Sequence, residues 1–222
     1  MFQLLKYFFY LAYHWNSRIA WHIIKEEWKG EKKYGIQTTG ADELKELEEL
    51  GIDLDHATIY MPVSYGLIEN CFEKISQLSD QPIQHMLDLG SGKGRALCIA
   101  PSYGIQQLTG IDFSKNLCNA AIENLENLKI KYPGIEYKII NNDAFYYEIP
   151  NTVDLIFLFN PFDEIILKGV TENMEASLKE KPRKLWILYA NPLHKEILLH
   201  AGFKEVFHVK KLRYLEASIL VK

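Results

Sequence analysis

The chain has 222 residues, of which 48% are hydrophobic and 13% aromatic, and its 25 basic and 29 acidic residues give a net charge of −4. This composition excludes a disordered chain and a collagen-like repeat, and the length predicts one domain, with or without an appendage. The mild acidity argues against a dedicated nucleic-acid-binding protein, which normally carries a basic excess. Cys71, Cys98 and Cys118 lack the spacing of a metal or redox site, so we expect reduced, buried thiols in a cytoplasmic protein.

Residues 1–24 predict an amphipathic helix rather than a membrane span. Their longest stretch without Lys, Arg, Asp or Glu runs only from Tyr7 to Ser17, well short of the roughly 20 apolar residues that a span needs. Two interpretations stay open: the helix packs on the domain or on a partner subunit, or it contacts a membrane surface. The apolar face recurs at intervals of three and four and comprises Leu5, Phe8, Ala12, Trp15, Ile19 and Ile23.

Residues 25–56 differ in character from the rest of the chain. They contain ten acidic and five basic residues, so this segment carries a net charge of −5 and the remaining residues together carry +1. The glycines and threonines of residues 30–40 predict a loop, and residues 41–50 predict a short solvated helix. We therefore divide the chain into an N-terminal extension, residues 1–56, and a domain, residues 57–222.

The domain begins with helical spacing over residues 57–79 and then alternates short apolar runs with helices. Alternation of this kind predicts an α/β fold with a doubly wound, mostly parallel sheet covered on both faces. The last two of the seven predicted strands have only about four residues between them, so they must be antiparallel and one strand must be reversed. The predicted strands are 85–89, 107–111, 135–140, 153–159, 184–190, 204–210 and 215–221, and the helices between them are 95–103, 114–132, 164–179 and 193–200.

A glycine-rich turn follows the first predicted strand. Its glycines allow a tight turn and the close approach of a ligand, and the next helix offers unpaired N–H groups. The spacing is G-x-G-x-G, whereas the dinucleotide fingerprint would need Gly or Ala where Arg95 stands. The acid at the start of the turn suits a ligand with a cationic or amine end. The turn reads Asp88-Leu89-Gly90-Ser91-Gly92-Lys93-Gly94-Arg95.

Acidic residues follow the second and third predicted strands. Asp112 lies 18 residues beyond Gly94, close to the spacing of about 20 at which an acid accepts hydrogen bonds from ribose hydroxyls. Phe113 can lie along an adenine face. Asp143, followed by Ala144, can accept the exocyclic amine of an adenine. The carboxyl ends of successive parallel strands converge on one crevice, so these residues predict a nucleoside site.

Asn160-Pro161-Phe162 follows the fourth predicted strand. The side-chain carbonyl of Asn160 and a backbone carbonyl at the strand end can hold an amine and align its lone pair on an electrophilic carbon. Such a site works by positioning. Phe162 supplies an aromatic wall.

Together these motifs resemble those of class I, seven-strand S-adenosylmethionine-dependent methyltransferases. The resemblance covers about residues 60–222 and implies that S-adenosylmethionine binds at residues 88–95, at Asp112 with Phe113, and at Asp143 with Ala144. It also implies an acceptor site at residues 160–162. Tyr60-Met61-Pro62-Val63-Ser64 resembles the entry motif of small protein-lysine methyltransferases, which implies that Tyr60 lies near the acceptor and Ser64 near the cofactor.

The sequence leaves the methyl acceptor open: a protein lysine, a nucleic-acid base or a small-molecule amine. Two other functions remain as alternatives, a cofactor-binding scaffold without catalytic activity and, with less support, an NAD(P)-dependent oxidoreductase. The histidines show no ligand spacing, so we expect no metal. As partners we expect the unknown acceptor, together with a second copy of the chain or a peripheral membrane contact through the N-terminal helix.

Overall fold

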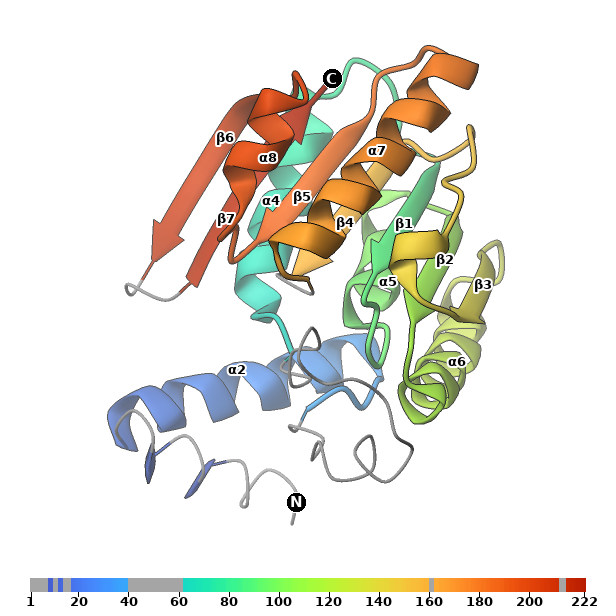
Figure 1. Ribbon diagram of the computed structural model, residues 1–222. Helices are drawn as coiled ribbons and strands as arrows, with labels where there is room; N and C mark the ends of the chain where they lie inside the picture. The colour runs from blue at the N-terminus through green and yellow to red at the C-terminus, as the bar shows by residue number, and fades with distance from the viewer. Residues whose placement is uncertain (1–7, 10–11, 14–16, 40–61, 160–161, 212–214) are drawn as a thin grey trace.

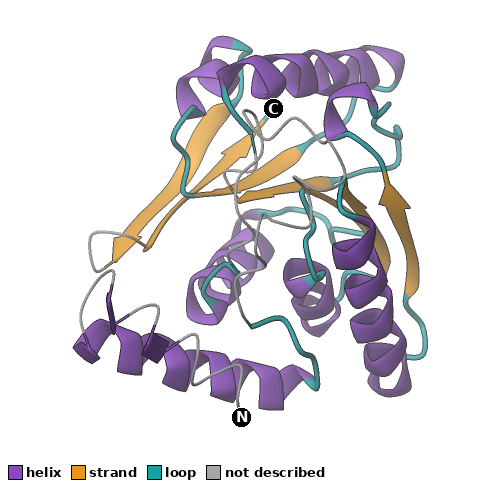
Figure 2. Ribbon diagram, turned by 60° about the horizontal axis from the view of Figure 1, so that its bottom comes forward, coloured by secondary structure: helices purple, strands orange, loops and turns teal. Residues whose placement is uncertain are grey.

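A computed structural model describes residues 8–9, 12–13, 17–39, 62–159, 162–211 and 215–222. Its centre is a seven-stranded sheet with helices on both faces (Figure 1, Figure 2). The predicted fold class is therefore confirmed. The strands are β1 (His85–Leu89), β2 (Gln107–Asp112), β3 (Glu136–Asn141), β4 (Leu155–Phe159), β5 (Trp186–Ala190), β6 (Lys204–Lys211) and β7 (Leu215–Val221). The helices are α2 (Ser17–Tyr34), α4 (Tyr65–Leu78), α5 (Arg95–Ile99), α6 (Lys115–Lys131), α7 (Glu164–Glu180) and α8 (Lys195–His200), with 3-10 turns η1 (Ala100–Tyr103) and η2 (Ala144–Tyr146).

The strand order is β3-β2-β1-β4-β5-β7-β6. The chain moves outward from β1 to β3 and then returns to the other side of β1 with β4, so the order reverses between β1 and β4. Ligands of open α/β sheets bind at the carboxyl ends of the strands beside such a switch point. Strand β7 is antiparallel to both β5 and β6, which confirms the predicted reversed strand and places it inside the sheet rather than at its edge.

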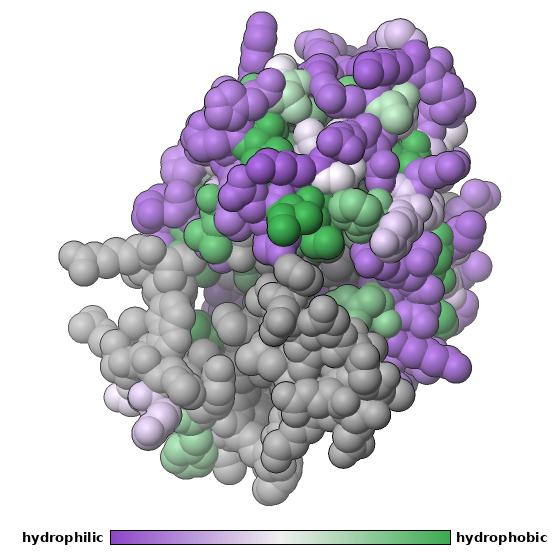
Figure 3. Space-filling model, viewed as in Figure 1, coloured by the Kyte–Doolittle hydropathy of each residue, from purple (hydrophilic) through white to green (hydrophobic). Residues whose placement is uncertain are grey.

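The central strands are buried on both faces because helices cover the sheet from both sides. All five residues of β5 are buried, as its nearly continuous apolar sequence predicts. Neighbouring residues alternate between two apolar clusters: Met86 packs with α4, α5 and α6, whereas Leu87 packs with α7 and α8. Hydrophilic residues predominate among the coloured residues on the face that Figure 3 shows. Cys71, Cys98 and Cys118 are free and buried, as expected.

Local signals set most of the element boundaries. Ser114 accepts a hydrogen bond from the backbone N–H of Leu117 and caps α6, as the sequence predicts. The predicted helix 95–103 is wrong in its second half, where the chain tightens into η1. Pro101 lies in this turn and has no backbone N–H to donate, so an α-helix cannot continue through it with all its hydrogen bonds.

The predicted loop over residues 30–40 is wrong at its start, because α2 continues to Tyr34. Gly30 does not break this helix. It lets α2 lie against α4 so closely that a Cβ at this position would overlap the ring of Tyr65. The helix ends instead at Gly35, whose φ of 71° is the left-handed conformation that favours glycine after a helix. The predicted short helix 41–50 and the division at residue 56 lie outside the described residues.

Helix α2 is attached to the sheet domain by a buried ion pair. Arg95, the first residue of α5, donates from Nη1 to Glu27 Oε1 at 2.8 Å and from Nη2 to Glu27 Oε2, and both side chains are 3% exposed. Its Nε donates to Thr38 Oγ1 at 2.8 Å, and the Tyr65 ring lies 4.0 Å from its guanidinium carbon. The described residues of the N-terminal extension are therefore held to the domain by buried side-chain contacts.

We predict that Glu27→Gln lowers the free energy of unfolding by about 3 kcal/mol, because breaking one side of a buried ion pair leaves the other charge without compensation. Urea denaturation measures this change. Glu164→Gln is the matched control: it breaks the exposed Glu164–Lys168 pair on α7, and an exposed pair contributes far less to stability than a buried one. Equal losses in the two variants would contradict the role assigned to Glu27.

Candidate methyl-donor and acceptor site

The glycine-rich turn has the conformation that a ligand cradle requires. Gly90, Gly92 and Gly94 have φ values of 79°, 54° and 76°, in the left-handed region that a side chain disfavours. The N–H groups of Gly90 and Ser91 both donate to the carbonyl of Ile111 at 2.9 Å, which ties the turn to β2. The turn therefore has a fixed shape at the carboxyl end of β1.

Close packing holds the turn against β2. Gly110 of β2 lies directly opposite Asp88 in the sheet. A Cβ on Gly110 would lie 2.9 Å from Ser91 Oγ and 2.8 Å from a methyl group of Leu97, distances that real Cβ atoms essentially never show. Glycine at this position lets the side chains of Ser91 and Leu97 pack on β2 without moving, a feature that the sequence alone did not reveal.

Asp88 is a buried acid at the switch point. It is 2% exposed, and its Oδ1 has no hydrogen-bond partner among the described residues. The hydroxyl of Ser91 is equally buried and also lacks a partner within the described part of the chain. Buried polar atoms normally have partners, so two such atoms beside a glycine turn fit a ligand that carries polar groups of its own.

Burial, with the nearby charge of Asp112, raises the pKa of Asp88 well above its ordinary value of 3.8. Removing a carboxylate from water disfavours its charged form. A cationic amine beside Asp88 would offset that cost. The site therefore favours a ligand with an ammonium group, as the sequence predicts.

Asp112 connects β2 to the turn. Its Oδ2 accepts the N–H of Gly92 at 2.8 Å and its Oδ1 accepts the N–H of Ser114 at 2.9 Å. Burial raises the pKa of this carboxyl, and the two backbone hydrogen bonds oppose that rise. Each carboxylate oxygen has a second lone pair, so Asp112 can accept ribose hydroxyls while it shapes the turn.

The predicted adenine-side residues lie at the ends of β2 and β3. Phe113 is 37% exposed, and its carbonyl accepts the side-chain amide of Asn141 at 2.7 Å. Asp143 is exposed and caps η2 by accepting the N–H of Phe145 at 2.9 Å, and Ala144 is buried at the start of that turn. The register pairs Asp112 with Asn141, so these residues surround one stretch of the sheet edge.

Two residues that we expected to bind the cofactor have other partners. The guanidinium of Arg95 is buried against Glu27, Thr38 and the carbonyl of Val63. Ser64 caps α4, and its hydroxyl donates to Glu26 Oε1 at 2.8 Å. The bonds of Arg95 hold α2 against the start of α5, and those of Ser64 hold α2 against α4; a contact of either residue with the cofactor stays a prediction.

Asn124 of α6 is a residue of the site that sequence reasoning missed. It is 4% exposed, and its Nδ2 donates to the carbonyls of Lys93 in the turn and of Gln37 at 3.0 and 3.1 Å. Its Oδ1 accepts the N–H of Gln37 at 2.8 Å. A single amide thus joins residues 36–39 to the glycine turn. Its only local signal is a polar residue at an inward-facing helical position.

The acceptor side is described in part. Phe162 is half-buried and packs against the apolar cluster beneath α7. Asp163 follows it and caps α7 by accepting the N–H of Ile166 at 2.9 Å. Tyr60, Asn160 and Pro161 lie outside the described residues. Asn160 directly follows Phe159, the last residue of β4, and β4 pairs with β1.

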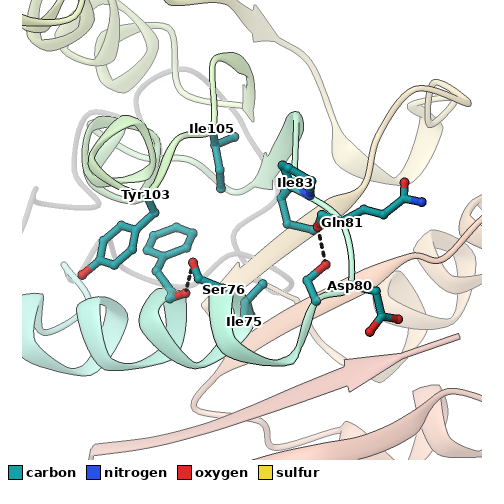
Figure 4. A pocket seen from close by; sticks show the side chains of 10 residues that line it. Ile75, Ser76, Asp80, Gln81, Ile83, Tyr103 and Ile105 are labelled. Carbon is teal, nitrogen blue, oxygen red and sulfur yellow. Dashed lines mark hydrogen bonds between the residues drawn. The ribbon is translucent and has the colours of Figure 1, made fainter.

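A separate pocket of about 320 Å³ lies at the opposite edge of the sheet (Figure 4). It is bounded by the C-terminal half of α4 and by Ile83 and Ile105, which precede β1 and β2. This position is at the amino ends of the strands, so the pocket is distinct from the glycine turn and Asp88 at the carboxyl ends. Among the described residues, no cluster of acidic, histidine or cysteine side chains suits a metal ion.

Comparison with known proteins agrees with this geometry. Residues 87–185 match the model of a methyltransferase domain family. A ribosomal protein L11 methylase from Lactobacillus delbrueckii subsp. bulgaricus superimposes with a TM-score of 0.51 at 17% identity, covering 69% of this chain and 76% of that one. An S-adenosylmethionine-dependent methyltransferase from Leishmania major gives 0.54 at 15% identity, covering 70% and 71%. A search of curated proteins found no match.

The buried position of Asp88 leads to a testable prediction about stability. The pKa of Asp88 is higher in the folded state than in the unfolded state. The contribution of Asp88 to the free energy of unfolding is therefore fully present below about pH 3.8, where the carboxyl is protonated in both states, and is lost as the pH rises through the folded-state pKa. Asp88→Asn removes this loss. We therefore expect the cofactor-free variant to be at least as stable as the wild type near pH 4 and more stable near pH 7.

Thermal denaturation across this pH range measures the difference between the two proteins. Added S-adenosylmethionine should reverse their order, because the wild type alone has an anion to pair with an ammonium group. A variant that is less stable than the wild type at neutral pH without cofactor would contradict this account of Asp88.

The sheet has a reversed strand, and Asp88 Oδ1 at the switch point has no hydrogen-bond partner in the part of the chain that the structure describes. Residues 87–185, which include the glycine turn, match a methyltransferase domain family, and the sheet order agrees with the class I type, whose methyl donor is S-adenosylmethionine.

Proposed function

We propose that this methyltransferase transfers the methyl group to an amine nitrogen held beside the end of β4. The observation that carries the cofactor side is the unpartnered Oδ1 of Asp88, which lies within the described part of the chain beside three left-handed glycines. The acceptor side is supported by the position of residues 160–162, which follow the strand paired with β1.

Five described residues would each bind one portion of the methyl donor. Asp88 and Ser91 would bind the polar end of the methionine portion, Asp112 the ribose, and Phe113 with Asp143 the adenine. When bound, S-adenosylmethionine supplies a methyl group on a sulfonium sulfur. The protein would need no nucleophile of its own, because the acceptor would take the methyl group directly.

The acceptor must present a free lone pair. An amide carbonyl at Asn160 accepts an N–H of the amine and leaves the nitrogen lone pair directed at the methyl carbon. Fixing this direction converts a bimolecular encounter into a positioned one. Phe162 packs against the apolar cluster of α7 and would exclude water from one side of the amine. Tyr60, from the segment before α4, would lie near the amine as well.

The acceptor class is found by incubating the protein with labelled S-adenosylmethionine and fractionated cell extract. Label in the protein fraction on a lysine, in nucleic acid or in a small amine identifies the class. Label on an oxygen or carbon atom would refute the amine proposal while leaving the methyltransferase assignment intact.

Asp112→Asn should weaken S-adenosylmethionine binding by roughly tenfold to a hundredfold, because the ribose hydroxyls lose a charged acceptor and one of the two backbone N–H groups, of Gly92 or of Ser114, loses its own. Isothermal titration gives the dissociation constant. Asp154→Asn is a matched control, since Asp154 also accepts two backbone N–H groups, of Gln84 and His85, but at the amino end of β1. The control should lose stability and keep its affinity; equal weakening in both variants would argue against the ribose assignment.

Asn160→Ala should leave the dissociation constant of S-adenosylmethionine within about twofold and lower kcat on the order of a hundredfold, as expected when an acceptor loses its alignment. Single-turnover measurements with the identified acceptor test this split. Asn151→Ala, which removes an amide that donates to Glu180 on the surface, serves as the control. Parallel losses of cofactor affinity and rate would assign Asn160 to the cofactor instead.

A further inference from the structure

One face of α2 has no part in the site and has an unusual composition. Trp21, Lys25, Trp28 and Lys32 recur at intervals of four, three and four residues, so they form a single stripe along the helix. Trp21 is 66% exposed and Trp28 is 54% exposed, and Lys25, Lys29 and Lys32 are exposed as well. The ammonium group of Lys32 lies 5.4 Å from the centre of the Trp28 ring. We call these five residues the outer face.

The acids of the same helix point the other way. Glu26 accepts hydrogen bonds from Ser64 Oγ and the N–H of Gly66. Glu27 pairs with Arg95. Glu31 accepts the backbone N–H groups of Thr38 and Thr39 at 2.9 and 2.8 Å. On α2 these three acids therefore accept hydrogen bonds from the domain or from residues 38–39, whereas Lys25, Lys29 and Lys32 lie on the outer face.

Exposed aromatic residues continue onto the segment before α2. Phe8 and Ala12 pack on Ala20 in a small apolar cluster that is separate from the two clusters of the sheet. The ring of Phe8 also meets Trp21 edge to face, with centroids 6.5 Å apart. Phe9 and Tyr13 remain 62% and 87% exposed. The aromatic surface is thus larger than α2 alone.

Tryptophan and lysine together match the chemistry of a lipid headgroup layer. An indole ring is favoured at the boundary between headgroups and acyl chains, and a lysine ammonium binds lipid phosphate. Contact surfaces between proteins are depleted in lysine. Single-stranded nucleic acid also uses aromatic rings and basic residues, but it is normally held in a groove, whereas the outer face lies along one helix at one end of the molecule (Figure 2).

We propose that the outer face of α2 binds the surface of a bilayer containing anionic lipids, with the helix lying in the plane of the interface. No helix among the described residues is long and apolar enough to cross a membrane. Helix α2 lies at the end of the molecule toward which the carboxyl ends of β1, β2 and β4 point (Figure 1). Binding would therefore turn the methyl-transfer edge of the sheet toward the membrane; this orientation rests on the proposed function, whereas lipid binding itself does not.

The test uses the full chain and vesicles of phosphatidylcholine, either alone or mixed with phosphatidylglycerol. We expect co-sedimentation with the mixed vesicles, weakening as salt screens the lysines, and little with phosphatidylcholine alone. Lys25→Gln/Lys29→Gln/Lys32→Gln should lower partitioning roughly a hundredfold, since each lysine near an anionic surface adds about 1 kcal/mol. The matched control is Lys179→Gln/Lys181→Gln/Lys204→Gln, three exposed lysines at the C-terminal end of α7 and the start of β6, which should change it less than twofold.

Trp21→Ala/Trp28→Ala should weaken binding to the mixed vesicles at least tenfold. In the wild type, brominated lipids should quench tryptophan fluorescence, and Trp21→Phe and Trp28→Phe should each reduce the quenching. Cofactor-induced thermal stabilisation confirms that every variant is folded and keeps its donor site.

Three results would each overturn the proposal: no binding to mixed vesicles, equal loss in the α2 and control lysine variants, or binding of single-stranded RNA in place of vesicles. Self-association through this face is measured by sedimentation velocity. A dimer that the tryptophan variants abolish, without vesicle binding by the wild type, would assign the face to a second copy of the chain. None of these outcomes bears on the methyltransferase assignment, which the labelled-donor assay tests separately.

Discussion

The buried pair of Glu27 and Arg95 is the interaction on which the arrangement of the site depends. Arg95 follows the glycine turn directly and begins α5, whereas Glu27 lies in the middle of α2. With both side chains 3% exposed, neither charge can exchange its partner for water, so the two helices hold a fixed relation. Thr38 and Tyr65 complete the surroundings of the guanidinium. A segment far from the turn in sequence thereby becomes part of its support.

Two further sets of hydrogen bonds hold residues 90–94 from opposite sides. From one side, Ile111 and Asp112 bind the backbone N–H groups of the turn. From the other, Asn124 joins the carbonyl of Lys93 to Gln37. Left-handed glycines give the turn its shape, but they also make it intrinsically flexible. The surrounding hydrogen bonds remove that freedom before a ligand arrives, which lowers the entropy cost of binding.

The net charge of the N-terminal extension does not predict the charge that α2 exposes. By sequence, residues 25–56 carry a net charge of −5, which suggests an acidic surface in front of the domain. In the structure, three of those acids, Glu26, Glu27 and Glu31, accept hydrogen bonds from the domain or from residues 38–39. What α2 presents to its surroundings is basic and aromatic. Net charge by itself therefore does not describe the surface that a partner meets.

Sequence alone determined the sheet, its reversed strand, and the acids and glycines at the strand ends, because these depend on short-range patterns: burial alternation, capping residues and turn chemistry. It also placed Asp88 and Asp112 in one crevice, since strand ends meet at a sheet edge. Only the tertiary structure showed that Arg95 and Ser64 hold the N-terminal segment, that Asn124 supports the turn, and that Gly30 serves close packing. Those roles depend on partners 31 to 87 residues away, and no local pattern specifies which distant side chain will fill a buried position.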